Sequence, residues 1–344
     1  MSAANDEGGG APLSVTRFAR DSSPAGGGAK ARFARTLLLL LFLTACATTA
    51  TQSTSSAPVL REQIWTEHSA TLAHDLTHAP RECVQRSADK AEQRAIEIGR
   101  ALFRSPVLLG GPAARTGLSC NACHSNGRVN AHFLLPELTD RAGAADVTSE
   151  WASKIRGDGV MNPRAIPDLA GVGAKATHGR LNDPSLEHFT HAVMTEEFQG
   201  PEPPPAAFAG VIAYLRALDP AACGSGEATE TLAGGANDVR RALTAAQSTD
   251  DPRTASLLVY ATQDAVGRLV ERLPAARFAT ERRQLEDLSR QLWPVRDADA
   301  QVLPALKAMA PAWGARFDGM VARIAPHESE TYFDEAQVRR LVAS

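Results

Sequence analysis

The sequence predicts an all-α protein, for two reasons. Apolar residues recur at helical spacing in several segments, such as Ala91, Ala95 and Ile98 within 88–103, and steps of three and four residues place them on one face of a helix. The stretches between these segments carry turn residues but little of the strict alternation that strands show. We therefore expect helices that are joined by turns and loops.

The composition is that of an ordinary soluble globular protein. The chain has 344 residues, of which 44% are hydrophobic and 22% charged, and this length suffices for one large or two ordinary domains. The formal net charge is only -3, and no long basic run interrupts the sequence. The charge therefore gives no indication of a nucleic-acid partner, and we expect none.

The N-terminal part reads as a leader and an export signal. Residues 1–28 are rich in Gly, Ser and Ala without an apolar period, so we expect disorder there. Lys30, Arg32 and Arg35 then precede the apolar run 37–43. A basic segment followed by a short apolar run is typical of a signal peptide, and the run is too short to span a bilayer.

The signal ends in Leu-Thr-Ala-Cys at Cys46, which resembles the lipobox of bacterial lipoproteins. The resemblance implies cleavage before Cys46 and attachment of lipid to it, so that the mature protein is a periplasmic, lipid-anchored membrane protein. Ala47 follows, and the sorting rule of such lipoproteins then favours the outer membrane. The alternative is a signal peptide without lipid in which Cys46 occurs by chance.

The pentapeptide Cys120-Asn121-Ala122-Cys123-His124 is the most informative stretch of the chain. Two cysteines separated by two residues, with a histidine after the second, form the attachment pattern of a c-type haem. One helical turn places both thiols where they can add to the two vinyl groups of a haem, and it directs the histidine at the iron. We therefore predict one covalent haem c, with His124 as the proximal ligand.

Three other interpretations of the cysteine pair are weaker. A zinc site would need a second pair of ligands at comparable spacing, and the sequence contains no other closely spaced cysteine pair. A thioredoxin-like redox pair should follow a strand and begin a helix, which the flanking residues do not indicate. A chance match is the third.

Two predicted helices bracket this motif. The segments 88–103 and 206–218 each carry an apolar stripe, and Gly99 inside the first would weaken that helix unless a neighbour approached closely. An N-terminal and a C-terminal helix that cross at a small residue around such a motif are how the cytochrome c fold closes. The loops between them could wrap a porphyrin, whose apolar surface replaces part of a conventional core.

Several short motifs, taken in order, resemble one haem domain of the bacterial dihaem cytochrome c peroxidases and their relatives. They are Gly99-Arg100-Ala101-Leu102-Phe103-Arg104-Ser105-Pro106, Leu118-Ser119 before the pentapeptide, Ile166-Pro167-Asp168-Leu169-Ala170-Gly171-Val172, Thr177-His178-Gly179-Arg180 and Ser185-Leu186-Glu187. The resemblance covers about 130 residues in the middle of the chain. Those peroxidases carry two CxxCH motifs, for electron entry and for peroxide, whereas this chain carries one.

The resemblance implies a methionine as the second axial ligand, shortly after 177–187. Met194 fits this position. A thioether favours reduced iron, and a six-coordinate iron has no free position for peroxide, so this assignment predicts electron transfer.

Other residues could also supply the second axial ligand. Met161 is the next candidate, His178, His188 and His191 are also capable, and an open site is the remaining possibility. Each has a simpler explanation, since a single methionine usually fills a core and surface histidines are usually solvated. The family match also allows His178 to lie at the haem edge without binding the iron. Arg164 and Arg180 could pair with the haem propionates.

Two cysteines, Cys83 and Cys223, remain after the lipidation and haem residues are assigned. They stand just before and just after the bracketed segment, and the ends of a compact domain often lie close together. In an oxidising compartment we expect them to form a disulfide. The alternative is two separate buried thiols.

The C-terminal region predicts a helical bundle. Asp251 followed by Pro252 signals a helix start, Pro274 ends that stripe, and two further stripes follow. The region could dock a redox partner, cover the haem edge or act as a scaffold. The expected division is a leader with lipoprotein signal peptide at 1–46, a tether at 47–60, a cytochrome c-like haem domain at 61–223, a linker at 224–236 and a helical domain of unknown role at 237–344.

These inferences together favour a membrane-anchored periplasmic monohaem c-type cytochrome that passes single electrons to and from an unidentified redox partner protein. The main alternative is a haem peroxidase-like enzyme with an open distal position. A third possibility is a haem-based sensor or assembly factor whose helical region carries the output.

Overall fold

A computed structural model describes residues 59–179 and 181–343. These residues are mostly helical, which confirms the all-α class. The only strands among them are very short: β1 (His78–Pro80) pairs antiparallel with β4 (Glu227–Thr229), and β2 (Ala144–Ala145) pairs with β3 (Arg164–Ala165). Within this described part, no helix has the length and apolarity needed to cross a membrane. The predicted leader, signal peptide and Cys46 lie outside the described residues.

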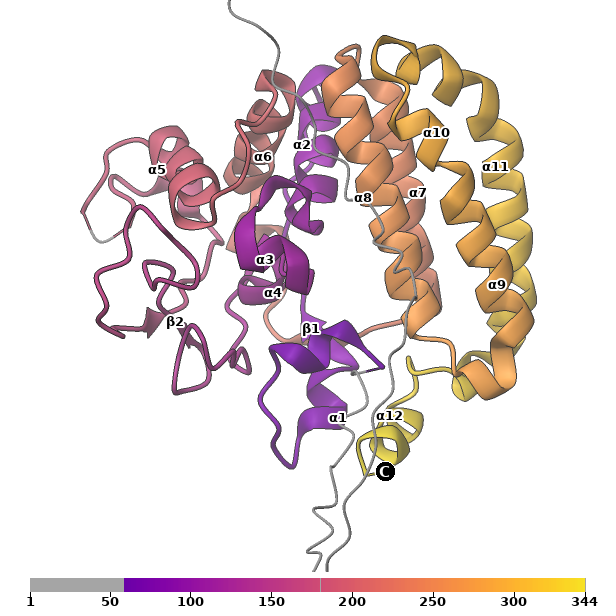
Figure 1. Ribbon diagram of the computed structural model, residues 1–344, viewed down its shortest axis with the longest axis horizontal. Helices are drawn as coiled ribbons and strands as arrows, with labels where there is room; N and C mark the ends of the chain where they lie inside the picture. The colour runs from indigo at the N-terminus through magenta and orange to yellow at the C-terminus, as the bar shows by residue number, and fades with distance from the viewer. Residues whose placement is uncertain (1–58, 180, 344) are drawn as a thin grey trace, which may run out of the picture. The chain divides into compact units, whose positions relative to one another are not determined.

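Helices α2 (Lys90–Phe103) and α6 (Pro205–Ala217) cross in close contact, as the sequence led us to expect (Figure 1). Asp89 caps the start of α2, where its carboxylate accepts hydrogen bonds from the first free backbone N–H groups. A Cβ on Gly99 would lie 1.9 Å from the carbonyl oxygen of Gly210. The neighbour that a glycine in this helix requires is therefore a second glycine in α6.

The chain between these two helices is mostly loop. Besides β2 and β3, its regular elements are η2 (Pro106–Leu108), α3 (Gly111–Thr116), α4 (Cys120–Cys123), η3 (Ser125–Gly127), η4 (Val172–Ala174), α5 (Leu186–Ala192) and the π-helical turn η5 (Val193–Glu197). Before α2 lie η1 (Arg61–Ile64) and α1 (Leu72–Asp75). Leu60, the last residue of the predicted tether, is buried against α1, so ordered packing begins slightly earlier than expected.

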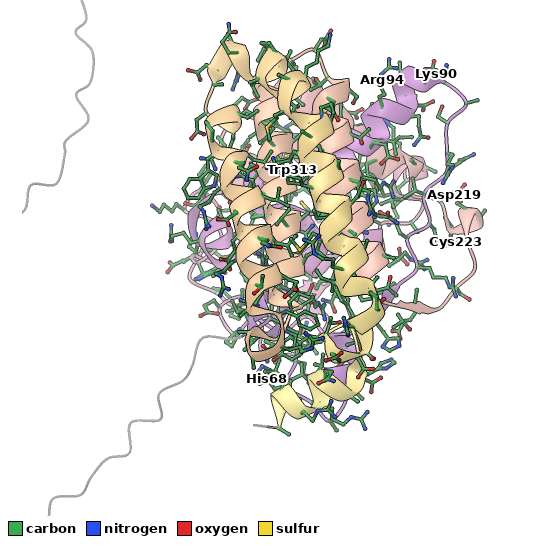
Figure 2. The ribbon with its side chains drawn as sticks, turned by 90° about the vertical axis from the view of Figure 1, so that its right-hand side faces the viewer. His68, Lys90, Arg94, Asp219, Cys223 and Trp313 are labelled. Atoms are coloured by element: carbon green, nitrogen blue, oxygen red, sulfur yellow. A yellow bond between two sulfur atoms is a disulfide. The ribbon has the colours of Figure 1, made fainter. Side chains whose placement is uncertain are left out.

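Long helices make up the C-terminal part: α7 (Leu232–Ser248), α8 (Pro252–Glu271), α9 (Ala275–Gln291), the short α10 (Trp293–Arg296), α11 (Val302–Ile324) and, after η8 (Ala325–Glu330), α12 (Glu335–Val342). Asp251 caps α8, where its carboxylate accepts from the Thr254 N–H. Trp313 is fully buried between these helices, and its indole N–H donates to the Leu288 carbonyl over 2.9 Å (Figure 2).

The segment 224–236, predicted as a linker, has regular structure instead. It contains β4, and α7 begins at Leu232. Thr231 caps that helix, since its hydroxyl accepts from the Gly234 N–H. Glycines normally weaken a helix, but a Cβ on Gly235 would lie 2.7 Å from the Leu269 side chain. The glycines that suggested a linker therefore allow α7 to lie close to α8.

The hydrophobic core continues across the predicted boundary between 61–223 and 237–344. One cluster of buried side chains includes Leu102 of α2, Tyr214 of α6, Val239 of α7 and Leu258 of α8. Figure 1 shows α2 between α6 on one side and α7 and α8 on the other. The two predicted parts thus share a core, and their separation into domains stays a prediction.

A buried ion cluster crosses the same boundary. Arg100 of α2 donates to Glu82 over 2.8 Å and to Asp238 of α7 over 2.7 Å, and Arg104 lies near both carboxylates. The Tyr214 hydroxyl completes the cluster with a hydrogen bond of 2.9 Å to Glu82. Burial acts to raise the pKa of Glu82, but the two guanidinium groups outweigh it and hold that pKa at about 2.

Candidate functional site

Helix α4 is a single turn that begins at Cys120 and ends at Cys123. The two cysteines are not joined to each other; Cys120 is half-buried and Cys123 is buried. Burial raises the pKa of Cys120 to about 11, and it raises the pKa of Cys123 as well. A redox-active pair depends on a lowered thiol pKa, so the environment of this pair does not fit thiol–disulfide chemistry.

His124 follows the turn with a fixed ring orientation. Its Nδ1 lies 3.0 Å from the carbonyl oxygen of Pro167, which can only accept a hydrogen bond, so Nδ1 carries the proton. Burial lowers the pKa of His124 to about 4, which keeps the ring neutral at pH 7. The lone pair therefore sits on Nε2, which has no hydrogen-bond partner among the described residues. A metal-binding histidine is commonly oriented by a backbone carbonyl in this way.

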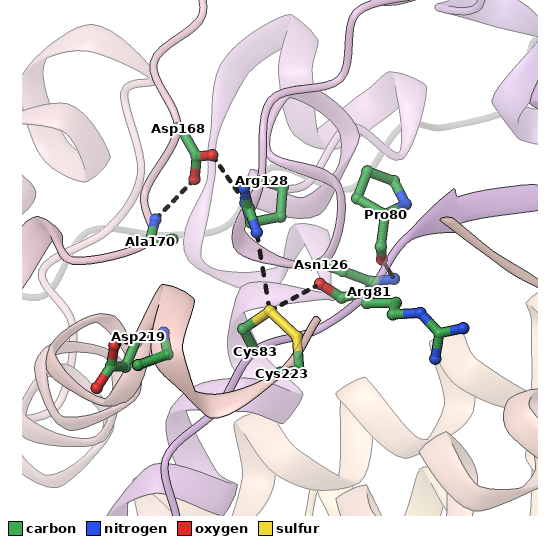
Figure 3. The surroundings of a disulfide bond; sticks show 10 residues. Pro80, Arg81, Cys83, Asn126, Arg128, Asp168, Ala170, Asp219 and Cys223 are labelled. Carbon is green, nitrogen blue, oxygen red and sulfur yellow. Dashed lines mark hydrogen bonds and ion pairs between the residues drawn. A yellow bond between two sulfur atoms is a disulfide. The ribbon is translucent and has the colours of Figure 1, made fainter. Parts of the chain in front are cut away.

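The loop that supplies the Pro167 carbonyl is attached to the turn after His124. The Arg128 guanidinium binds Asp168 over 2.7 Å (Figure 3). The Leu169 N–H donates to the Gly127 carbonyl over 3.1 Å. Gly127 itself has a positive φ of 75° and lies against the Leu218 side chain, so a larger residue would not fit. These contacts hold the Pro167 carbonyl oxygen within hydrogen-bond distance of His124 Nδ1.

Cys83 and Cys223 form a disulfide beside this loop, with their Cα atoms 5.1 Å apart (Figure 3). The backbone aligns them, because the Asp219 N–H donates to the Cys83 carbonyl and the Gln85 N–H to the Ala217 carbonyl. The Arg128 guanidinium, which binds Asp168, lies 3.7 Å from the Cys83 sulfur. The disulfide therefore contacts Arg128, which in turn binds the loop that orients His124.

Met194 is buried, with 2% of its surface exposed, and it lies in the π-helical turn η5 after α5. Ser185 caps α5 by accepting from the His188 N–H over 3.1 Å, and the Gly200 N–H donates to the Met194 carbonyl over 2.7 Å. Single π-helical turns occur frequently at functional sites. Met161, by contrast, is 49% exposed.

The candidate histidines differ in their surroundings. His178 is 7% exposed, and its ring stacks on Phe189 with centroids 6.2 Å apart. His188 is exposed and pairs with Asp183, whereas His191 binds Glu202 over 2.9 Å. Both of these rings therefore already have carboxylate partners at the surface. Arg164 is exposed, and Arg180 lies outside the described residues.

The cysteine turn and the turn that carries Met194 border a common apolar region. Cys123 belongs to a cluster of buried side chains with Ile166 and Phe198, and Val193 packs against that cluster. Cys120 packs against both this cluster and the main core, which contains Met194. The site thus combines two thiols and one neutral imidazole with a free lone pair in apolar surroundings, and Val193, the residue before Met194, packs beside them.

Sequence reasoning did not assign a role to Pro167. The motif Ile166-Pro167-Asp168 contributed to the family resemblance, but a carbonyl oxygen is common to every residue, so nothing in the sequence distinguishes the one that accepts from His124.

Comparison with protein-family models, with curated proteins and with solved structures found no match to this chain.

Proposed function

We propose that this protein binds one haem c through Cys120, Cys123 and His124 and transfers single electrons. The observation that carries the proposal is the hydrogen bond from His124 Nδ1 to Pro167, which leaves a neutral ring with its lone pair on Nε2. This is the protonation state that an iron ligand needs. The donor set fits the group, because both thiols are free and lie in apolar surroundings.

Each residue has a definite task in this proposal. Cys120 and Cys123 hold the cofactor by thioether bonds, and the Pro167 carbonyl fixes the plane of the His124 ring. The haem would supply a one-electron iron couple whose potential depends on the axial ligands and on solvent exclusion. The apolar side chains around the cysteine turn would exclude water from that couple.

Met194 would be the second protein ligand of the iron. Among the candidates in the described part of the chain, only Met194 and His178 are buried, and His188 and His191 are held by surface carboxylates. The π-helical turn and the Ser185 cap would position the Met194 thioether. A methionine ligand leaves no open coordination position, which favours electron transfer over peroxidase chemistry.

The proposed fold is a cytochrome c-like haem domain followed by a helical bundle. The crossing of α2 and α6 at Gly99 and Gly210 supports it, since two close-packed helices can close the loop-rich segment that carries the motif. The C-terminal helices would then support the haem domain through the shared core. Arg180 and His178 would lie at the haem edge, as the family resemblance implies.

The proposal includes export to the periplasm and a lipid anchor at Cys46, with an unidentified redox protein as partner. The disulfide between Cys83 and Cys223 supports export, because such bonds persist in oxidising compartments. Haem attachment to CxxCH in bacteria occurs in that same compartment.

Optical spectroscopy of the full chain, produced in a host with haem-ligation machinery, tests the proposal. We expect a covalently bound c-type haem, a low-spin ferric spectrum and the weak near-infrared band of methionine ligation. Met194→Ala should abolish that band and open the iron to added ligands, whereas the matched variant Met161→Ala should leave the spectrum unchanged. Colourless protein with both thiols of the motif free would contradict haem attachment, and high-spin wild-type protein that turns over peroxide would favour the enzyme.

A further inference from the structure

A second group of ligand-type side chains lies where the two ends of the described chain meet. His74 comes from α1, His78 begins β1 and Glu335 begins α12, and one potential ligand atom from each lies within 4.8 Å of the others. All three side chains are half-buried. Figure 1 shows α1, β1 and α12 together at one end of the structure.

The separations approach those of a metal site. The His74 Nδ1 and Glu335 Oε2 atoms are 3.5 Å apart. Zinc–ligand bonds of about 2.0–2.1 Å place neighbouring ligand atoms of a tetrahedron about 3.3 Å apart. Glu335 also binds Arg339, but it does so through its other oxygen, Oε1, over 2.6 Å. One carboxylate oxygen therefore remains directed at the histidine.

A second carboxylate orients His74 from the opposite side. Glu227 of β4 has its Oε2 3.3 Å from the Nε2 of His74. A metal-binding histidine commonly donates its other ring N–H to a carboxylate, which fixes the tautomer and makes the ligand nitrogen more basic. With Nε2 directed at Glu227, the other nitrogen, Nδ1, is the atom that faces Glu335 and would bind the ion.

His78 is also held on both sides. Its Nδ1 lies 3.2 Å from the His74 carbonyl oxygen, and its Nε2 lies 3.1 Å from the Thr229 hydroxyl. The His74 and His78 rings stack with centroids 3.9 Å apart. The carboxylates of Glu227 and Glu335 both lie beside His74, and their negative charge favours a divalent cation there.

We propose that His74, His78 and Glu335 bind a divalent transition-metal ion of the zinc type, with Glu227 orienting His74. Imidazole nitrogens favour such an ion over calcium or magnesium, which prefer oxygen ligands. Binding requires both stacked rings to rotate so that their lone pairs reach one point, and the ion would replace the Thr229 hydroxyl at His78 Nε2. The site is separate from the CxxCH motif, and the inference does not depend on the proposed electron transfer.

The ion would fasten α12 to the start of the described chain. The apolar contact there is small: Val338 of α12 packs against a cluster of Leu60, Leu72, Ala73 and Leu76. The proposed ligands lie on α1, β1 and α12, so one ion would join three elements that are distant in sequence. A ligand that binds only the folded state stabilises it, so the expected role is structural.

Calorimetric titration of the full chain with ZnCl2, after treatment with a chelator, tests the proposal. We expect one tight zinc ion per chain, with affinity at least tenfold lower in Glu335→Gln and in His78→Gln. The matched control is His68→Gln, which removes an exposed histidine outside the group and should leave the affinity unchanged. Hydrogen exchange in 335–342 should also slow when zinc is added to the wild type.

Anomalous scattering measured just above and just below the zinc absorption edge locates the ion independently of any variant. Only zinc changes its signal across that edge, so a haem iron is not mistaken for zinc. Density between His74, His78 and Glu335 would support the proposal even if a variant failed to fold. Absence of binding at millimolar zinc, or a single ion that both variants retain with unchanged affinity, would overturn it.

Discussion

Gly99 and Gly210 meet where two helices cross, and the backbone of one occupies the space that a side chain of the other would fill. The contact joins α2 to α6, the helices that bracket the loops around the CxxCH turn. The distance between α2 and α6 therefore determines how closely those loops are held together.

Replacing Gly99 by Ala should destabilise the protein by about 2 kcal/mol, because the overpacking cost exceeds the roughly 1 kcal/mol gain in helix propensity. The measurement is the free energy of unfolding by denaturant titration. Gly314→Ala in α11 is the matched control, since no atom lies within 4 Å of the Cβ it would add. That variant should be as stable as the wild type or slightly more stable. Equal effects of the two substitutions would show that the crossing is less tight than described.

Replacing Asp238 by Asn should cost about 3 kcal/mol, because it leaves Arg100 of α2 and Arg104, the residue that ends this helix, without a full counter-charge in a mostly buried position. Asp238 accepts from Arg100 and lies near Arg104, and these contacts connect α7 to α2. Asp318→Asn, which removes an exposed partner of Arg240, should change stability by less than about 1 kcal/mol. Unfolding free energies of both variants decide the comparison.

Acid should weaken the same cluster in a defined pH range. The pKa of Glu82 falls from 4.5 to about 2 on folding, so its contribution to stability is complete above pH 4.5. It is lost as the pH falls from 4.5 toward 2, by up to about 3 kcal/mol. Glu82→Gln should flatten the decline in unfolding free energy over this range. A decline of the same slope in the variant would assign the acid sensitivity to other carboxyl groups.

Removing the disulfide should lower stability mainly through the unfolded chain. The bond closes a loop between residues 140 apart in sequence, for which the chain-entropy relation gives about 5 kcal/mol. The double variant Cys83→Ser with Cys223→Ser should therefore unfold at lower denaturant concentration. Reductant should destabilise the wild type and leave the double variant unaffected.

Under the proposed function, the cap of α5 should influence the iron through Met194. Ser185→Ala removes the acceptor for the His188 N–H and should cost about 1 kcal/mol. Under the proposed function, it should also weaken the near-infrared methionine band, because the turn that carries Met194 becomes less fixed. Thr231→Ala removes a comparable cap from α7 and should lower stability without changing that band. Identical spectra in both variants would mean that α5 does not position the ligand.

The sequence was most informative where a pattern is local. The apolar stripes, the Asp251 cap, and the need for a close neighbour at Gly99 could all be predicted from spacing and residue type. The start of α7 could not, because Gly234 and Gly235 weaken a helix unless tertiary packing compensates, and the side chain of Leu269 that packs there is distant in sequence.

Contacts between distant segments explain what was missed at the candidate sites. The Pro167 carbonyl reaches His124 across 43 residues, and His74 meets Glu335 across 261. Neither pairing can be predicted from the spacing of residues in the sequence. For the second axial ligand, Met194 and Met161 could be ranked from the sequence only by family resemblance, whereas the structure separates them by burial.

The C-terminal half of helix α2 is covered on two sides, by α6 on one and by α7 and α8 on the other. A protein engineer who wanted the CxxCH region by itself could not simply cut the gene after residue 223, because the exposed flank of α2 would present Arg100 and an apolar strip to solvent. A shortened protein would need polar residues on that side of α2, or it would have to keep α7 and α8 to cover it.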